Sequence, residues 1–579
     1  MLLEQLREYH RRLEPTPTMY GPSPVRWLID LDPQGNFQGM VPMEGEGRRA
    51  PRGKVLLIPQ VSRTSTVRAN LLVDNAKYAL GVPGDKTQRA RERAAKAHRA
   101  FIALARECAE ETREPAVHAV VACLERPAPP SLPPDIGPGD IVMFRVDGAM
   151  PTDLRSVQAF WARRQAAATA ASARGETVDC LICGQRRPPA TRHPVKIKGI
   201  PGGQSSGTAL VSANMPAFES YGLEASRTAP ICQGCAEEYA KGANQLIRDG
   251  RTRLVIGPVM YLFWTREAST DLSISSLLQD PQPEDVQALL RTPWTSQAGA
   301  TKVEATAFYA TALAASMGRV AVREWLEMTV GEAREHLVQY FALQRIVRPD
   351  GSNWRPIGLF PLAASVVPPG SDIPAVISTG LLRLAIAGAS PPQALLTGAL
   401  RRARMCGRAE RPVTYPRAAV IKMVLQSRER EGPTMEELDP KLRHPAYLCG
   451  RIFAIVEAVQ YAALGQVGTT VTDRYFGAAS TTPAYVLGKL VSDSRKAHFG
   501  KLRRQKPAAY YALDQRLSEA MDGLGEFPET LTLEEQGRFV LGYYHQRAAD
   551  RKAARARREL GDLVPGQEQE EAPPGGGEQ

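Results

Sequence analysis

The sequence lacks the long apolar runs and leader-type segments that would place a protein in or across a membrane. No run reaches the roughly 18 apolar residues that a spanning helix needs. The N-terminus, MLLEQLREYHRRLEPTP, has neither a secretory apolar region nor a small-residue cleavage site. Eight cysteines in 579 residues, without such a signal, indicate a reducing compartment. We therefore expect a cytoplasmic protein with no membrane partner.

Residue patterns of the common enzyme classes are also missing. H-E-x-x-H does not occur, and the stretch GVPGDKT (81–87) is too short to be a phosphate-binding P-loop. The G-x-S-x-G match GQSSG (203–207) lies within a glycine-rich segment and not between a predicted strand and a helix. The eight histidines are scattered, without the His/Asp cluster that a metal-dependent nuclease requires. These absences favour a non-catalytic binding protein. The alternative is a nuclease or other nucleic-acid-processing enzyme with an unrecognised site.

The chain has fewer acidic than basic residues. Lys and Arg number 73 against 61 Asp and Glu, which gives a formal net charge of +12 and a pI of about 9.3. Such an excess fits a polyanionic partner such as nucleic acid, although many basic proteins bind none. A content of 43% hydrophobic and 23% charged residues is typical of a globular protein.

Strand and helix patterns alternate in the first half of the chain. The stretch 24–42 surrounds the turn Pro33-Gln34-Gly35-Asn36 and predicts a β-hairpin, while 54–61 and 140–146 predict further strands. A helix is expected over 86–113, where eight basic and four acidic side chains are typical of a solvated face above a modest apolar side. We further expect an amphipathic N-terminal helix, a helix over 151–174 and strands within 253–267.

Two C-x-x-C pairs, Cys180-Leu-Ile-Cys183 and Cys232-Gln-Gly-Cys235, are separated by 48 residues. Each pair places two thiolates on one tight turn, and two such turns complete a tetrahedral sulfur site for zinc. The separation exceeds that of a compact zinc ribbon, so the intervening segment must loop out. Because the protein would fill all four ligand positions and leave none for water, we predict that the zinc ion is structural. The alternatives are unpaired or redox-active cysteines, or His193 in place of one ligand.

The residues between the cysteine pairs form an unusual glycine-rich segment, HPVKIKGIPGGQSSGTALVSANMPAFESYG. Two lysines alternate with aliphatic residues there and precede the run Gly202–Gly207. Glycines allow close backbone approach to a ligand, and free amides suit phosphates. A mobile surface loop explains the composition equally well. The predicted nucleic-acid contacts in this segment are Lys196, Lys198, Gln204 and Ser205.

The stretch QVSRTSTVRANLLVDNAKYALG (60–81) has no acid before Asp74. Its arginines and lysine can neutralise phosphates, and its hydroxyl groups can hydrogen-bond them. Asn70 is the candidate for contact with a base edge, because an amide both donates and accepts. Asp74 is expected to cap or pair locally, and an ordinary solvated loop is the alternative for the whole stretch. The predicted DNA contacts are Arg63, Thr64, Ser65, Arg68, Asn70 and Lys77.

From about residue 301 onward the periodicity is largely helical, with no clear strand over 446–560. The fold prediction is α+β: a mixed N-terminal domain with a zinc-knuckle-like insert, then a mostly α-helical C-terminal half ending in a helical bundle. The expected regions are an α+β domain (1–150), an α+β region with the four cysteines (151–267), a mainly helical region (268–445), the bundle (446–561) and a disordered acidic tail (562–579).

The predicted bundle carries a row of basic residues beside an apolar stripe that includes Phe453 and Val459. These basic residues could simply form a solvated face. They could equally line a path for displaced single-stranded DNA or pack beside the guide–target duplex. Its predicted DNA contacts are Lys489, Arg495, Lys501, Arg503 and Arg504.

Several stretches together resemble the Csd-type large subunit of the type I-C (Dvulg subtype) CRISPR effector complex, Cascade. They include MLLEQLREYHRRL, SRTSTVRANLLVDNAKYALG, HPVKIKGIPGGQSSGTALVSANMPAFESYG, GRVAVREWLEMTV, YLCGRIFAIVEAVQYAALG, DRYFGAASTTPAYV and EEQGRFVLGYYHQR. These stretches cover most of the chain in the expected order, which makes coincidence an inadequate explanation.

The resemblance implies a non-catalytic subunit that recognises the protospacer-adjacent motif in duplex DNA, promotes R-loop formation and supports recruitment of the helicase–nuclease. The implied partners are crRNA, the target duplex and its displaced strand, the backbone and crRNA-processing subunits, and a small subunit. The C-terminal helical region corresponds to that small subunit, which such systems can also make separately. A zinc-containing transcription regulator, a further alternative, does not explain these stretches. The zinc prediction rests on cysteine spacing alone.

Overall fold

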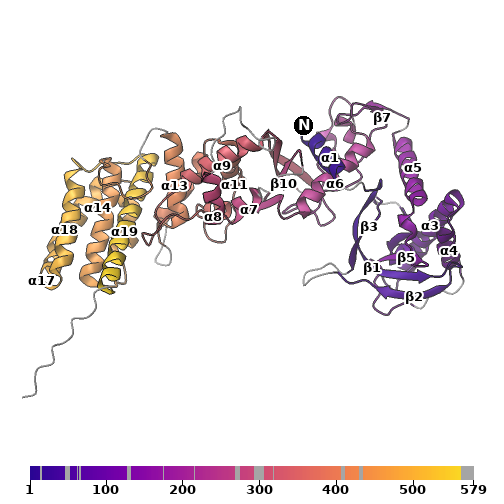
Figure 1. The fold of residues 1–579 in the computed structure, drawn as a ribbon, viewed down its shortest axis with the longest axis horizontal. Coiled ribbons are helices and arrows are strands. Elements are labelled where there is room, and N and C mark those ends of the chain that lie inside the picture. The colour runs from indigo at the N-terminus through magenta and orange to yellow at the C-terminus, as the bar shows by residue number, and fades with distance from the viewer. Residues whose placement is uncertain are drawn as a thin grey trace, which may run out of the picture. The chain divides into compact units, whose positions relative to one another are not determined.

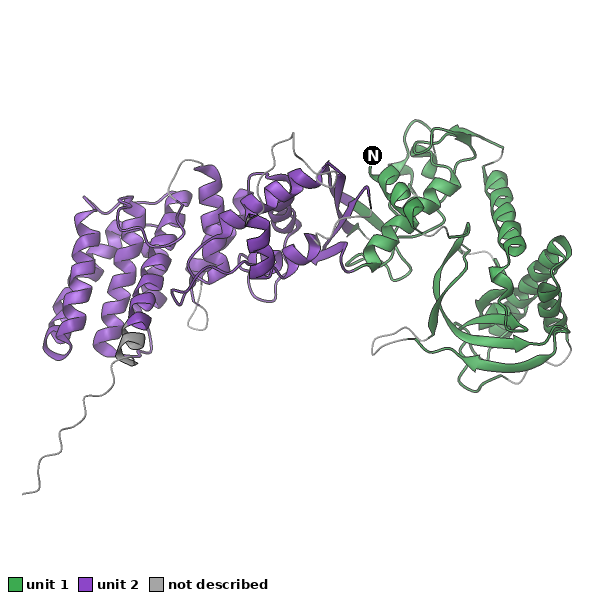
Figure 2. Cartoon of the chain, viewed as in Figure 1, with its two compact units in different colours: residues 1–249, 315–321 green, residues 250–314, 322–579 purple. Residues whose placement is uncertain are grey.

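The computed structural model of the protein contains two compact units (Figure 2). Unit 1 comprises residues 1–249 with 315–321, and unit 2 comprises residues 250–314 with 322–579. The boundaries expected at 150, 267 and 445 stay predictions, and the expected tail beyond Asp562 lies outside the described residues. The structure describes residues 1–13, 16–45, 53–61, 63, 67–126, 132–173, 175–213, 215–223, 225–267, 274–291, 305–316, 318–405, 411–429 and 434–562.

A five-stranded sheet organises the N-terminal part of unit 1 (Figure 1). The long strand β1 pairs antiparallel with β3 through its first half, antiparallel with β2 through its second half, and parallel with β5. The Asp32 carboxylate accepts the backbone N–H groups of Gln34 (2.9 Å) and Asn36 (2.8 Å), which closes the predicted hairpin. The strands are β1 (Tyr20–Leu31), β2 (Phe37–Pro42), β3 (Lys54–Pro59), β4 (Val73–Asn75) and β5 (Ile141–Val146).

Helices pack against this sheet and form its apolar core. Phe101, Phe144 and Trp161 are almost completely buried, and each such side chain contributes roughly 1.5–3 kcal/mol by leaving water. The predicted helix over 86–113 is confirmed, with its alanine and phenylalanine side buried and its basic side exposed. These elements are α2 (Ala76–Ala79), α3 (Gln88–Thr112), α4 (Pro115–Leu124), η1 (Pro151–Asp153) and α5 (Arg155–Ser172).

A second part of unit 1 is built on two packed helices, α1 (Leu2–Arg12) and α6 (Gln233–Arg248). The two backbones approach closely at Gly242, where an added Cβ would lie 2.1 Å from the Leu6 carbonyl oxygen. Only glycine fits this position without moving the helices apart. The remaining short elements are β6 (Val178–Asp179), β7 (Arg186–Arg187), η2 (Pro216–Phe218) and η3 (Ala225–Thr228).

Most of a four-stranded sheet, in the order β11-β10-β9-β8, belongs to unit 2, while the end of β10 and the start of β11 fall in the segment 315–321 that is assigned to unit 1. The expectation of helix from about residue 301 is wrong for β10 and β11. Residues of β10 are alanine-rich, but Phe308, Ala310 and Ala312 point into the core in strand alternation, and burial in the sheet overrides the helical preference of alanine. The strands are β8 (Arg253–Ile256), β9 (Val259–Thr265), β10 (Ala307–Ser316) and β11 (Arg319–Thr329).

The rest of unit 2 is helical, which confirms the predicted helical C-terminal half. Its core runs without interruption from the sheet to the last helix. The helices are α7 (Ile274–Gln279), α8 (Pro283–Arg291), α9 (Val330–Gln344), α10 (Leu359–Ala364), α11 (Ala375–Ala387), α12 (Gln393–Met405), α13 (Tyr415–Arg428), α14 (Pro445–Leu464), α15 (Val471–Ala479), α16 (Pro483–Ser494), a π-helical turn (Arg495–Phe499), α17 (Gly500–Gln505), α18 (Pro507–Asp522) and α19 (Leu533–Asp562).

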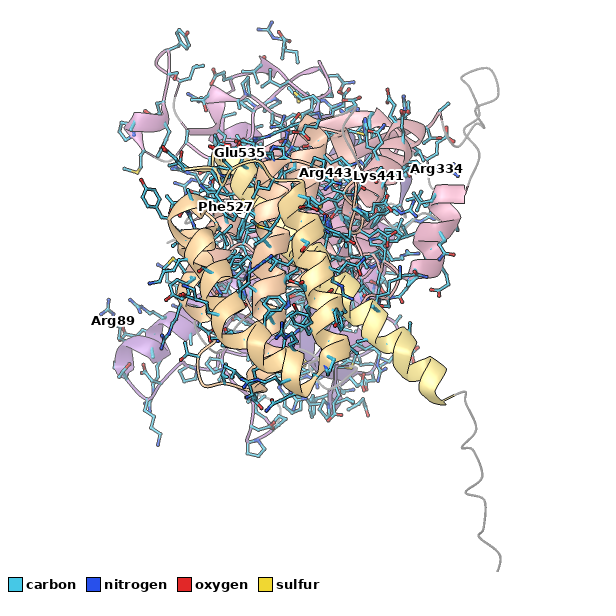
Figure 3. The ribbon with its side chains drawn as sticks, turned by 90° about the vertical axis from the view of Figure 1, so that its left-hand side faces the viewer. Arg89, Arg334, Lys441, Arg443, Phe527 and Glu535 are labelled. Carbon is cyan, nitrogen blue, oxygen red and sulfur yellow. The ribbon has the colours of Figure 1, made fainter. Side chains whose placement is uncertain are left out.

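The closest helix pair of unit 2 is α14 against α19. Gly450 faces the Phe539 carbonyl oxygen and Gly542 faces that of Tyr447, so that an added Cβ would come within 2.0 Å and 2.1 Å respectively. Figure 3 views these helices with Arg443 and Glu535 labelled near their N-terminal ends. By length and composition α14 is apolar enough to cross a membrane, but 61% of its apolar window is buried inside the unit. It is therefore the central helix of the bundle core.

Two titratable basic side chains, His545 and Lys422, are enclosed in this helical core. His545 is 0% exposed, and its Nδ1 lies 3.0 Å from the Tyr447 hydroxyl. Lys422, also 0% exposed, donates to the Ala342 carbonyl at 3.3 Å. Burial, together with the Lys422 charge, lowers the pKa of His545 to about 3, and burial lowers the pKa of Lys422 to about 8. His545 is therefore neutral in the folded protein at physiological pH.

This burial predicts a pH dependence of stability. The folded-state pKa of His545 lies below its unfolded value of about 6.5. The contribution of neutral His545 to folding stability is therefore fully present above pH 6.5 and is lost as pH falls toward 3. We expect the free energy of unfolding of the wild type to fall by about 1.4 kcal/mol more per pH unit below 6 than that of His545→Asn. Denaturant unfolding between pH 7.5 and 5 measures the difference. The exposed His118→Asn variant is the control and should follow the wild type, whereas parallel curves for all three would contradict the prediction.

Candidate metal centre and nucleic-acid interface

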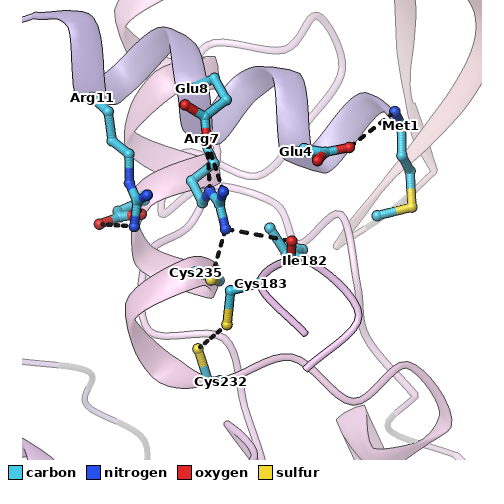
Figure 4. Close-up of polar contacts among 10 residues, drawn as sticks. Met1, Glu4, Arg7, Glu8, Arg11, Ile182, Cys183, Cys232 and Cys235 are labelled. Atoms are coloured by element: carbon cyan, nitrogen blue, oxygen red, sulfur yellow. Dashed lines mark hydrogen bonds and ion pairs between the residues drawn. The ribbon is translucent and has the colours of Figure 1, made fainter. Parts of the chain in front are cut away.

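The four predicted cysteine ligands converge in unit 1. Figure 4 shows three of them, Cys183, Cys232 and Cys235. Cys180 and Cys183 lie on the turn between β6 and β7, and Cys232 and Cys235 lie at the N-terminus of α6. Their sulfur atoms all lie within 4.8 Å of one another, and those of Cys183 and Cys232 are 4.0 Å apart. Three of the four side chains are buried. The two C-x-x-C pairs therefore form one cluster.

Local backbone geometry presents each cysteine pair. In the first pair the Cys180 N–H donates to the Gln185 carbonyl (3.1 Å) and the Gly184 N–H donates to the Cys180 carbonyl (2.8 Å). Gly184 has φ +67°, a left-handed conformation that glycine adopts without steric cost. In the second pair Cys232 caps α6, so Cys235 lies in the first helical turn, where the helix dipole favours a thiolate.

The cluster fits a zinc ion. A Zn–S bond length of about 2.3 Å requires sulfur atoms about 3.8 Å apart in a tetrahedron, close to the observed separations. A hydrogen bond with Cys235 lowers the pKa of Cys232 to about 5, which provides one thiolate at neutral pH. Four protein ligands fill the coordination sphere, so a bound zinc ion would hold the fold together and leave no position for a substrate. His193 is not among the residues of the cluster, and its Nδ1 lies 2.5 Å from the Tyr239 hydroxyl.

Arg7 of α1 supports the cluster, although sequence analysis did not identify it. Its side chain is almost buried, and Nη1 lies 3.7 Å from the Cys235 sulfur and 3.4 Å from the Ile182 carbonyl oxygen. A zinc ion with four thiolates carries a net charge of −2, which a guanidinium stabilises. No sequence pattern indicates this contact, because it joins residues 228 positions apart.

A cavity of about 350 Å³ lies elsewhere in unit 1 and gathers cations from three segments. Arg63 comes from the stretch after β3, Lys196 and Lys198 from the glycine-rich segment, and Lys241 and Arg248 from α6. No acidic residue is among the described residues that line it. The structure thus brings together the two stretches that the sequence analysis proposed separately as nucleic-acid contacts.

Asn244 of α6 holds the lysines of the glycine-rich segment in place. Its Oδ1 accepts the Lys198 N–H and its Nδ2 donates to the Lys196 carbonyl, each at 2.9 Å. Between them Ile197 is buried and exchanges two backbone hydrogen bonds with Thr208. Both lysine side chains are consequently exposed. Gln204 and Ser205 lie at the exposed tip of the segment and do not line the cavity.

Arg63 contributes to the cavity and also holds its own loop together. It forms an ion pair with the buried Asp74, donates to the Arg68 carbonyl (2.8 Å) and lies 4.1 Å from the centre of the Tyr78 ring. Burial raises the pKa of Asp74, and Arg63 opposes that shift. The expected local pairing of Asp74 is confirmed. Arg63 therefore has a structural role that the sequence analysis did not assign.

The other predicted contacts of this stretch differ in accessibility. Asn70 is 7% exposed, and its amide donates to the Pro59 carbonyl, so contact with a base edge would require the side chain to turn outward. Arg68 is exposed and Lys77 is half-buried. Thr64 and Ser65 lie outside the described residues.

The predicted contacts of the C-terminal helices belong to unit 2. Lys489 is on α16, Arg495 begins the π-helical turn, and Lys501, Arg503 and Arg504 are on α17. All are exposed except the half-buried Lys501, while Phe499 and Leu502 between them are buried. Their role as DNA contacts stays a prediction.

The metal centre generates a prediction about zinc retention. Protein purified without chelator should contain about one zinc ion per chain, and Cys232→Ser should lose it because three sulfurs remain. Arg7→Ala should keep the zinc but bind it 10–100-fold more weakly, as expected for a lost outer contact to a ligand. Elemental analysis and competition with a chromogenic chelator measure both effects.

The control is Arg11→Ala. Arg11 lies one helical turn from Arg7 on α1 but pairs with Glu238 on the surface, so its removal should leave zinc affinity unchanged. Metal-free wild-type protein would refute the zinc site, and equal affinities of the two arginine variants would refute the role of Arg7.

Comparison with known proteins identifies the family of the chain. The family model described as CRISPR-associated protein (Cas_Csd1) matches residues 3–550. No curated protein matches the chain. Because the family match covers nearly the full length, the protein belongs to the Cas_Csd1 family of CRISPR-associated proteins.

Proposed function

We propose that the protein is the non-catalytic large subunit of a type I-C CRISPR surveillance complex, that it recognises the protospacer-adjacent motif in duplex DNA, and that it promotes R-loop formation. The family implies membership of a CRISPR effector complex with nucleic acid and Cas partners. Pairing with the crRNA would select the target, while the protein contacts the short motif and the DNA backbone. The further proposed partners are the backbone and crRNA-processing subunits, the small subunit and the helicase–nuclease.

The observation that carries this proposal is the cationic cavity of unit 1. Arg63 and Lys241 are already paired, with Asp74 and Glu237 respectively. Lys196, Lys198 and Arg248 have no acidic partner among the described residues, so they can neutralise phosphates. Duplex DNA presents one negative charge per about 1.7 Å of axis, which suits cations spread over neighbouring segments.

Gln204 is the residue best placed to contact a base edge. Its backbone carbonyl accepts the Gly207 N–H at 2.8 Å and closes the turn at the tip of the glycine-rich segment. The Gln204 side chain is exposed, whereas the amide of Asn70 is directed into the protein and donates to the Pro59 carbonyl. An exposed amide can pair with the donor and acceptor of an adenine edge. Phosphate contacts by the lysines would set the position from which Gln204 acts.

The chemistry of the metal centre supports the proposed non-catalytic role. A four-thiolate zinc ion has no open position at which to activate water, unlike the metal sites of hydrolytic enzymes. The exposed cations of α16 and α17 suit the displaced strand, because backbone contacts tolerate any sequence. The complex would therefore bind and open DNA and leave cleavage to the helicase–nuclease.

The phosphate-contact role of the lysines is tested by salt dependence. The double variant Lys196→Gln/Lys198→Gln, assembled into the complex, should bind matched and motif-scrambled duplexes more weakly by a similar factor. Its slope of log affinity against log salt should fall by about 2, one for each lost contact. Binding isotherms at several salt concentrations measure this slope. The same mixtures with Mg²⁺ but no helicase–nuclease should leave the DNA uncut.

The control for these lysines is Lys96→Gln, which removes a positive charge from the exposed face of α3. It should keep the wild-type slope. If the double variant also keeps that slope, the cavity does not bind DNA.

Gln204→Ala should produce a different defect. Loss of one base contact should reduce the preference for matched over scrambled duplex by roughly 1–3 kcal/mol, with non-specific binding and salt slope unchanged. Competition between the two duplexes for one complex measures the preference directly. Unchanged preference would exclude Gln204 as a base contact.

A further inference from the structure

Unit 2 contains a separate cavity that no part of the proposed function uses. It has a volume of about 210 Å³ and lies between α19 and the segment that leads into α13. Three arginines line it: Arg411 before α13, and Arg547 and Arg551 one turn apart on α19. Tyr415 and Tyr544 contribute aromatic walls.

The arginines carry more positive charge than the described acids around them compensate. Arg547 pairs with Glu457 at 3.0 Å. Arg551 donates to the Pro349 carbonyl at 2.9 Å, and Arg411 has no side-chain partner among the described residues. Burial and the charges of Arg547 and Arg411 lower the pKa of Arg551. Three like charges around one cavity repel each other, and an anion between them removes that repulsion.

The walls of the cavity are held rigidly by buried groups. Arg417 of α13 is 2% exposed and donates to the carbonyl groups of Ser365 (3.1 Å), Arg411 (3.3 Å) and Pro412 (2.5 Å). On the opposite wall the Tyr544 hydroxyl donates to the Val347 carbonyl at 2.8 Å. These bonds fix the backbone that carries Arg411 and the helix that carries Arg551. A ligand would thus meet preformed donors, which reduces the cost of binding.

Size and chemistry indicate which anion fits. Guanidinium groups match phosphate and carboxylate oxygens, but one carboxylate occupies a single arginine, whereas a tetrahedral phosphate presents oxygens in several directions. The volume is below the roughly 300–1,000 Å³ of pockets that enclose whole small molecules. The tyrosine and proline walls suit the organic part of an ester next to the charge.

We propose that this cavity binds a phosphate ester group through Arg411, Arg547 and Arg551. The group comes either from the backbone of a nucleic-acid strand or from a free nucleotide, and both sources present the same phosphate chemistry. The site lies in unit 2 and depends on neither the unit 1 cavity nor motif recognition.

Full-length protein and its variants test the proposal with three probes: a labelled single-stranded oligodeoxynucleotide, the mononucleotide dTMP and the dicarboxylate succinate. Arg411→Gln and Arg551→Gln should each weaken binding of the phosphate probe about tenfold or more, because each removes a charged hydrogen bond. The Arg411 side chain is exposed and forms no hydrogen bond or ion pair among the described residues, so Arg411→Gln removes its charge without breaking such a contact. Fluorescence anisotropy and calorimetry give the affinities.

The matched control is Lys552→Gln, which removes a positive charge next to Arg551 from the exposed side of α19 and outside the cavity. It should change affinity less than twofold, since its surface ion pair with Glu437 is weak. If the arginine substitutions weaken binding of the oligonucleotide but not of dTMP, the site binds the backbone of a strand. If they weaken binding of dTMP, the site binds a free phosphate ester. Affinities unaltered by either arginine substitution, or succinate binding as tightly as the phosphate probes, would overturn the proposal. Because Lys196→Gln/Lys198→Gln leaves this site intact, failure here is distinguishable from failure of the unit 1 interface.

Discussion

Cys180 and Cys183 lie on one turn and Cys232 and Cys235 begin the helix α6, so a metal ion shared by their sulfurs would join two points 48 residues apart. The consequence extends along α6. Its first turn supplies two cysteine sulfurs, and its last two turns supply Lys241, Asn244 and Arg248 to the cationic cavity. A metal that fixes one end of a helix also fixes the direction of the other. The glycine-rich segment between the cysteine pairs then returns along α6 through Asn244.

The N-terminal helix completes this arrangement from the opposite side. Close contact at Gly242 lets α1 lie directly on α6, and Arg7 extends from it to the Cys235 sulfur. Burying a guanidinium without partners costs free energy. Here the Cys235 sulfur and the Ile182 carbonyl oxygen accept hydrogen bonds from Arg7, and Glu8 forms an ion pair with it, which offsets that cost. The charge that stabilises the metal centre is therefore separate from the charges available for a ligand in the cavity.

Basic side chains in this protein have different roles, which depend on the groups that surround them. Arg63 and Arg417 are committed to a carboxylate or to backbone carbonyl groups, and they hold loops. Lys196, Lys198 and Arg411 lack such partners among the described residues and remain able to bind anions. His545 and Lys422 are enclosed in the core, where burial lowers the pKa of both. Composition alone counts all seven as basic residues, whereas partners and burial separate them into three groups.

The sequence by itself determined the elements whose signal is local. Turn residues identified the hairpin around Gly35, apolar strand-like runs identified β3 and β9, alternation identified β5, and spacing identified the four cysteines as one set. The alternation of lysines with aliphatic residues around Ile197 was visible in the sequence, and the structure buries Ile197 and exposes Lys196 and Lys198. Each of these features depends on residues close in sequence, or on a side chain as distinctive as a thiol, and so could be predicted without the fold.

Only the tertiary structure decided the features that depend on distant neighbours. The alanine-rich β10 is a strand because the sheet on both sides buries it. Asn70 is directed inward because the Pro59 carbonyl, brought close by the fold, accepts its amide. Arg7 lies within hydrogen-bond distance of the Cys235 sulfur, and Arg411 and Arg551 line one cavity. Each pair is far apart in the sequence, and no periodicity predicts that its members are neighbours. Local pattern determines what an element is, but packing determines which side chains remain free to act.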